Sequence, residues 1–182
     1  MVAAEQTRPM TIGEFRDFVE QPENTNRTFE LINGEIKEVS PSRTRNSEFP
    51  MLITIAVGIF CRERKLPCHI SGADGAYNID GHVVAPDFAY KPTPMSDEYP
   101  DPEPPLWVVE VISPTDNAPD IRAKRQIYIQ AGILYWEMYP QSESIDVYAP
   151  GQPPRTINIT EILDGGDVLP GFTLSMHELF GK

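Results

Sequence analysis

Cysteine is scarce in this sequence, which contains only Cys61 and Cys68. Two cysteines do not make a disulfide framework, and the absence of a Cys-x-x-Cys pair argues against a structural zinc site. No apolar run is long enough to span a bilayer, and residues 1–7 lack the apolar core of a signal peptide. These absences predict a protein of the reducing cytoplasm with no membrane partner.

Basic side chains are also few. The sequence has 15 Lys and Arg against 27 Asp and Glu, a formal net charge of -12. Such a surface repels nucleic acid unless basic groups gather locally or a divalent metal offsets the acids. The charge is therefore the chief observation against a DNA-binding function.

The size and the order of patterns indicate the fold class. A chain of 182 residues with 40% hydrophobic content suits a single domain over residues 1–182, in which residues 1–10 are a candidate for disorder. Helical and strand patterns alternate in the middle of the chain, with hairpins at both ends. This order predicts an α/β (α+β) fold with a mixed central sheet flanked by helices.

Local patterns place the expected elements. Thr11 and Glu14 form a capping box for a first helix, Asn33-Gly34 is typical of a tight hairpin turn, and Pro50 suits the first turn of a long helix. Helices are expected at 11–19, 47–65, 120–131 and 175–180, and strands at 28–40 (a hairpin), 68–72, 76–80, 83–90, 106–114, 134–139, 144–148 and 155–159.

The stretch Leu106–Pro114 reads as a short strand buried on both faces, because it is apolar and bounded by prolines. Glu110 stands in its middle. A buried carboxylate has to be paired, protonated or metal-bound. A salt bridge to a Lys or Arg is the simplest interpretation of Glu110 alone.

Other charged residues raise a second interpretation of Glu110. If the strand at 107–112 lies beside the strand ending at Asp87, the two carboxylates can approach one Mg²⁺. Lys124 shares a helix face with Asp120 and Tyr128 and could stabilise charge on a phosphoryl group. Alternatively, Asp87 merely ends a strand and Lys124 pairs with Asp120 in solvent. The residues alone leave both interpretations open.

Five parts of the chain occur in a fixed order and spacing: Phe29–Ile36, Ala85–Asp87, Val108–Pro114, the helix residues Asp120, Lys124 and Tyr128, and Ala131–Trp136. Together they resemble the Uma-two family. The resemblance runs from about Thr11 to Phe180. It implies a restriction-endonuclease-like fold of the PD-(D/E)XK nuclease superfamily, with extra antiparallel strands. It also implies an endonuclease that hydrolyses DNA phosphodiester bonds with Mg²⁺ or Mn²⁺.

The same resemblance assigns the metal ligands and the catalytic residues. Asp87 and Glu110 match the two acidic positions, and the backbone carbonyl of Val111 is implied as a further metal ligand. Lys124 is implied as the superfamily lysine, displaced to the following helix. Glu30 is implied to hold a second metal or a metal-bound water.

Two departures weaken the resemblance. The superfamily lysine normally stands two residues after the second acid, where this chain has Ile112. Family members often carry a histidine near the positions of Asn46 and Ser47, and this chain has none there. A weakened or altered activity is consistent with that difference.

Two other functions stay open. A non-catalytic interaction module would keep the fold, with Glu110 and Lys124 as a buried ion pair. A nuclease acting on RNA or small nucleotides would suit the acidic charge better than duplex DNA does. A homodimer is a further expectation, formed by the aromatic and apolar strand residues Tyr135, Trp136, Met138, Tyr139 and Tyr148, unless these residues pack within the monomer.

Overall fold

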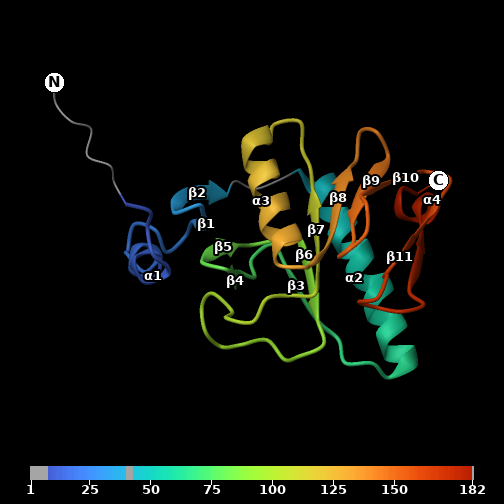
Figure 1. Cartoon of the computed structure of the whole chain (residues 1–182), viewed down its shortest axis with the longest axis horizontal. Helices are drawn as coiled ribbons and strands as arrows, with labels where there is room; N and C mark the ends of the chain where they lie inside the picture. Colours follow the sequence, from blue (N-terminus) through green and yellow to red (C-terminus); the bar gives the residue numbers. More distant parts are fainter. Residues whose placement is uncertain (1–7, 40–42, 182) are drawn as a thin grey trace.

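The structure, a computed structural model, describes residues 8–39 and 43–181. Figure 1 shows its elements. In chain order they are α1 (Ile12–Val19), β1 (Thr28–Ile32), β2 (Glu35–Val39), α2 (Thr44–Arg64), β3 (His69–Gly72), β4 (Tyr77–Ile79), β5 (His82–Val84), β6 (Phe88–Lys91), β7 (Trp107–Val111), α3 (Ala118–Gln130), β8 (Leu134–Tyr139), β9 (Ser144–Tyr148), β10 (Arg155–Asn158), β11 (Ile162–Asp164), β12 (Thr173–Ser175) and α4 (Met176–Leu179).

The main sheet has six strands in the order β10-β9-β8-β7-β6-β3. Strands β7 and β8 run parallel and are joined through α3, whereas the other neighbours are antiparallel. A smaller sheet has the order β2-β1-β5-β4, and β11 pairs with β12. The predicted mixed sheet with extra antiparallel strands is therefore confirmed.

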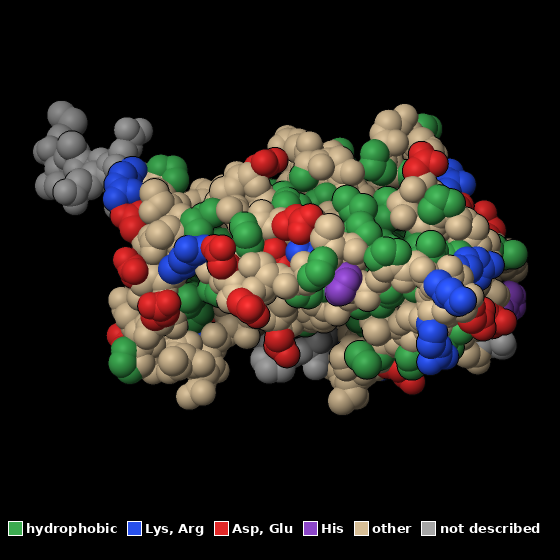
Figure 2. Space-filling model, turned by 90° about the horizontal axis from the view of Figure 1, so that it is seen from below, with side chains coloured by type: hydrophobic (Ala, Val, Ile, Leu, Met, Phe, Trp, Pro, Cys, Tyr) green, Lys and Arg blue, Asp and Glu red, His purple; other side chains and the backbone are tan. Residues whose placement is uncertain are grey.

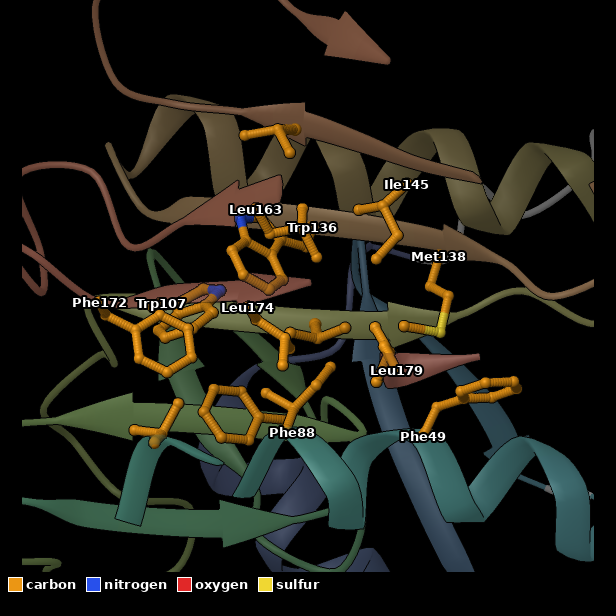
Figure 3. Close-up of a cluster of buried hydrophobic side chains, with 14 of the residues drawn as sticks. Phe49, Phe88, Trp107, Trp136, Met138, Ile145, Leu163, Phe172, Leu174 and Leu179 are labelled. Atoms are coloured by element: carbon orange, nitrogen blue, oxygen red, sulfur yellow. The ribbon is translucent and has the colours of Figure 1, made fainter. Parts of the chain in front are cut away.

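Alternate residues of β7 face the two sides of the main sheet, as the strand period of two requires. Trp107 and Val109 belong to the core under α2, together with Trp136 and Phe88 (Figure 3). The indole of Trp107 meets that of Trp136 edge to face at 4.5 Å between ring centroids. All five β7 residues are buried, as predicted for this strand.

Helix α3 covers the opposite face of the sheet. Its Ile127 and Tyr128 pack against Val108 and Tyr135 in a separate apolar cluster that also contains residues of the smaller sheet. Glu110 is two residues from Val108 and therefore lies on the same face of β7, so its side chain points toward α3. The polar site therefore lies on the α3 face, away from α2.

The N-terminal expectations agree with the structure where it describes them. The capping box of Thr11 and Glu14 is present, and β1 and β2 form the hairpin through Asn33 and Gly34. For the expected disorder over 1–10, residues 1–7 lie outside the described residues. The backbone N–H of Met10 donates to the Gly34 carbonyl at 3.1 Å. Among the helices described, none is both long and apolar enough to cross a membrane.

Two predictions about element boundaries are wrong. Helix α2 begins at Thr44, so Pro50 lies inside it instead of in its first turn. The stretch 83–90 is not one strand, because the chain leaves the smaller sheet after Val84 and enters the main sheet at Phe88. Pro86 lacks the N–H that a continuous ladder needs. Consequently Asp87 precedes the strand beside β7 and does not end it.

The predicted basis for a homodimer is also wrong. Tyr135, Trp136 and Met138 are fully buried within the monomer, because β8 lies between β7 and β9. Tyr148 stacks on Tyr135 at 5.5 Å, and the Tyr139 hydroxyl donates to Glu137. Tyr135, Trp136 and Met138 are therefore used in the core and are not available for a second copy, whereas Tyr139 and Tyr148 are partly buried.

Candidate functional site

A cavity of about 670 Å³ opens where the smaller sheet, the C-terminal end of β7 and the N-terminal half of α3 meet. Its size falls in the range of ligand sites. Glu30, Asp87, Glu110 and Lys124 all line it, although they come from four different parts of the chain.

Glu110 lies at the floor of this cavity and is only 8% exposed. Its Oε1 accepts hydrogen bonds from the Tyr128 hydroxyl at 2.7 Å and from Lys124 Nζ at 3.2 Å. Both donors are on α3 and are one helical turn apart, which places them on one face. The carboxylate is thus oriented from the helix that follows its own strand.

Lys124 bridges two carboxylates. Its Nζ lies 2.8 Å from Glu30 Oε1 and 3.2 Å from Glu110 Oε1. The same oxygen of Glu30 accepts the backbone N–H of Ala85 at 2.9 Å, and Glu30 is 4% exposed. The ammonium group is therefore held between the two sheets by buried acids.

Asp87 occupies the connection between β5 and β6, where the chain passes from one sheet to the other. Its Oδ2 accepts the backbone N–H of Val111 at 2.8 Å. This bond ties the connection to the end of β7, one residue after Glu110. Pro86 and the strand switch bring Asp87 to the cavity.

Burial dominates the electrostatics of the acids. Burial raises the pKa of Asp87 above its usual value, against the lowering effects of the Val111 N–H and Lys124. Burial also raises the pKa of Glu110 to about 8; Lys124 opposes this shift, and the neighbouring carboxylates of Asp87 and Glu30 reinforce it. For Lys124, burial would lower the pKa, but Glu110 and Glu30 raise it, so the amine stays charged.

The donor set fits a divalent ion that keeps much of its own water. Among residues 8–39 and 43–181, no three Asp, Glu, His or Cys side chains converge as a metal cage. Mg²⁺ does not require one, since one or two carboxylates with water and phosphate oxygens suffice. Asp87 Oδ1 and Glu110 Oε2 accept no hydrogen bond from any described residue, so each acid retains an oxygen for a cation.

The structure places the predicted site residues around one cavity. Glu30, Glu110 and Lys124 are in direct contact, and Asp87 is joined to Val111 through the latter's N–H. Lys124 does not pair with Asp120 in solvent, because Asp120 is paired with Lys37 instead. The metal-binding and catalytic roles of these residues stay predictions.

Two tyrosines of the site received no role from the sequence. Tyr128 donates to Glu110, and Tyr135 lines the cavity while donating to Glu137 Oε2 at 2.8 Å. Arg125 Nε also donates to that oxygen at 2.8 Å, and Glu137 is completely buried. The spacing of Lys124 and Tyr128 on one helix face was the available signal for Tyr128. Nothing in the sequence distinguished Tyr135 from a core aromatic.

The cavity lining is more acidic than basic. Its acids are Glu30, Glu38, Asp87, Glu110, Asp116 and Asp120, and its cations are Lys37, Arg43 and Lys124. Lys37 is engaged by Glu35 and Asp120 at 3.3 and 3.5 Å. An anionic substrate therefore requires added positive charge at this site, which a divalent ion can supply.

Comparisons with known proteins show a family and a similar fold. The sequence matches the family described as "Uma2: Putative restriction endonuclease" over residues 15–177. The fold is similar to that in the "Crystal structure of a putative nuclease belonging to DUF820 from Anabaena variabilis ATCC 29413", with a TM-score of 0.78. The two sequences are 17% identical, and the likeness covers 95% of this chain and 98% of the other. No curated protein matches the sequence.

Proposed function

The chain belongs to the Uma2 family, and from this premise we propose that it is a metal-dependent endonuclease that hydrolyses DNA phosphodiester bonds. One observation carries the proposal. Lys124 is held by Glu30 and Glu110 in a cavity that Asp87 also lines. Two acids with free oxygens beside a fixed ammonium group suit the hydrolysis of a phosphodiester.

The site residues have separate roles in the proposed hydrolysis. Asp87 and Glu110 hold Mg²⁺ or Mn²⁺, with the Val111 carbonyl as a further ligand in the proposal. When bound, the ion polarises the phosphate and lowers the pKa of a water molecule. Lys124 stabilises the negative charge that develops on the phosphate oxygens.

Glu30, which the resemblance assigned to a second metal or a metal-bound water, is a positioning residue in this proposal, as is Tyr128. Glu30 holds the ammonium of Lys124 at 2.8 Å and is itself fixed by the Ala85 N–H. Tyr128 holds Oε1 of Glu110 at 2.7 Å, which leaves Oε2 for the cation. Groups held in this way need little reorganisation during the reaction.

The experiment is cleavage of supercoiled plasmid and linear DNA by the purified protein with Mg²⁺, Mn²⁺ or EDTA. We expect metal-dependent cleavage that Asp87→Asn lowers at least about 100-fold, since losing even the partners of metal ligands often costs 10–100-fold. Asp97→Asn is the matched control, because Asp97 is exposed in the 92–105 loop. A preparation that cuts no DNA and binds neither ion contradicts the proposal, and cleavage that Asp87→Asn leaves unchanged comes from a contaminant.

One observation favours other substrates, and the same assays test it. The acidic lining favours RNA or small nucleotides, so both belong in the substrate panel. A non-catalytic module would keep the same contact between Lys124 and the two glutamates, with these groups only supporting the fold. That module predicts no hydrolysis of any substrate and no ion binding by the wild-type protein.

A further inference from the structure

Helix α2 exposes a row of large apolar side chains on its outer face. Met51, Leu52, Ile55 and Ile59 are 59%, 38%, 54% and 43% exposed. Single exposed apolar residues are ordinary, but positions spaced by three and four residues adjoin on a helix surface. These four residues, here called the α2 stripe, form one patch, and such patches mark interaction sites.

Opposite charges flank the α2 stripe along the helix. Glu48 precedes it and Arg62 follows it, and both are exposed. Within the part of the chain that the structure describes, neither side chain has a hydrogen-bond or ion-pair partner. Seen from below in Figure 2, Lys and Arg side chains gather at the right, where Figure 1 places the C-terminal end of α2.

The pattern is symmetric about Ile55. Met51 and Ile59 are equally far from Ile55 in sequence, and so are Glu48 and Arg62. Two copies of α2 that run antiparallel and cross at Ile55 therefore bring Met51 to the second copy's Ile59 and Glu48 to its Arg62. A parallel pair would place Glu48 against Glu48, which is repulsive.

Gly58 supplies an observation that is independent of charge. It lies within α2, where glycine weakens a helix relative to alanine. A Cβ built at Gly58 would meet nothing within 4 Å, so packing inside the monomer does not require glycine there. Gly58 is related to Leu52 by the same symmetry about Ile55. A Leu52 side chain from a second copy, packed closely against the helix backbone, explains the glycine.

We propose that α2 is the interface of a homodimer, in which the α2 stripe of two copies packs antiparallel about a two-fold axis at Ile55, with Glu48–Arg62 pairs at both ends. The interface is isologous, so each favourable contact occurs twice. One helix from each copy buries less than about 1,200 Å², which is typical of weak specific complexes, so the expected dissociation constant is micromolar. The cavity lies on the opposite face of the main sheet, so this dimer does not depend on the proposed function.

The first test is the molar mass of the wild-type protein by light scattering over a series of concentrations. We expect a reversible change from monomer to dimer. Ile55→Glu places two carboxylates on the axis and should leave a monomer. Ile129→Glu is the matched control, because Ile129 is 47% exposed on α3, and it should dimerise like the wild type. A wild-type protein that is monomeric throughout, or an unchanged dimer of Ile55→Glu, overturns the proposal.

Charge reversal tests the antiparallel arrangement. Glu48→Arg and Arg62→Glu should each weaken the dimer by about tenfold, because each new repulsion occurs twice. The double variant restores both attractions and should dimerise within about threefold of the wild type. A double variant that is weaker than both single variants overturns this register.

Gly58→Gln separates dimerisation from folding. The substitution should leave the melting temperature of the monomer unchanged or raised, because glutamine is a better helix former than glycine. It should nevertheless weaken the dimer at least about tenfold, since Leu52 of the second copy loses its space. A Gly58→Gln protein that dimerises as tightly as the wild type contradicts the proposed contact.

Discussion

Replacing Glu110 by glutamine distinguishes a metal ligand from a purely structural ion pair. The amide keeps the shape of the side chain and an oxygen for the Tyr128 hydroxyl. Lys124 loses one partner but keeps Glu30 at 2.8 Å. The substitution also removes an acid whose pKa is raised by burial, and whose charged form therefore opposes folding. We expect the free energy of unfolding without metal to fall by less than about 1 kcal/mol.

The response to Mg²⁺ gives the larger difference. An ion at 100 times its dissociation constant stabilises the folded protein by about 2.7 kcal/mol. For a chain of this length that is a rise of roughly 5–10 °C in melting temperature. We expect the wild type to show this rise and Glu110→Gln to lose it, as measured by calorimetry with and without Mg²⁺.

A structural ion pair predicts the reverse result. Breaking a buried pair by removing one partner costs about 3–5 kcal/mol, which is a loss of roughly 6–20 °C here. If Glu110→Gln melts that much lower and responds to Mg²⁺ as the wild type does, the metal-ligand role of Glu110 is refuted.

Three further predictions concern charge inside the protein. Because burial raises the pKa of Glu110 to about 8, its contribution to stability is greatest below its ordinary pKa and is lost as the pH rises through about 8. Chemical denaturation without metal should therefore show wild-type stability falling relative to Glu110→Gln between pH 5 and 8, and a constant difference would contradict this. Arg125→Ala should lower the free energy of unfolding, measured by urea denaturation, by about 3–5 kcal/mol, because it leaves the fully buried Glu137 without its cationic partner. A loss below about 1 kcal/mol would be inconsistent with that pair. Lys91→Met removes the ammonium 2.7 Å from Asp101, which lies in the 92–105 loop, and should speed proteolysis of that loop, whereas equal cleavage of both proteins would exclude Lys91 as its anchor.

The elements that the sequence predicted well have strong local signals. The capping box of Thr11 and Glu14 and the turn at Asn33 and Gly34 are determined by nearby backbone hydrogen bonding and by a positive φ at Gly34. Strand β7 could be predicted because a short apolar run between prolines has few other stable conformations. These features depend little on the rest of the chain.

The features that the sequence did not predict depend on distant contacts. The stretch 83–90 has a continuous strand pattern, and only the pairing of Val83 with Leu31 and of Phe88 with Val109 shows that it serves two sheets. Likewise, the row of aromatic residues in β8 looks the same in sequence whether it is covered by the core or by a second copy.

In the site too, the residue types could be predicted from local patterns, but most contacts between them could not. The residue types and their order indicated four charged residues and left a Glu110–Lys124 pair as one alternative, but they did not indicate that Lys124 also contacts Glu30. That Lys124 contacts Glu30 follows from the packing of the smaller sheet against α3, and local patterns contain no information on that packing. The Tyr128 hydroxyl reaches Glu110 because α3 packs on the face of β7 toward which Glu110 points. Burial, and hence the raised pKa of Glu110, also appears only in the folded chain.

The central claim is that Asp87 and Glu110 hold one divalent ion, and the most direct measurement is the anomalous difference density of a crystal soaked in Mn²⁺. The account predicts a single strong peak with a carboxylate oxygen of Asp87 and one of Glu110 each about 2 Å away. Density absent from the cavity at saturating Mn²⁺, or a peak bound by only one of these acids, would contradict it.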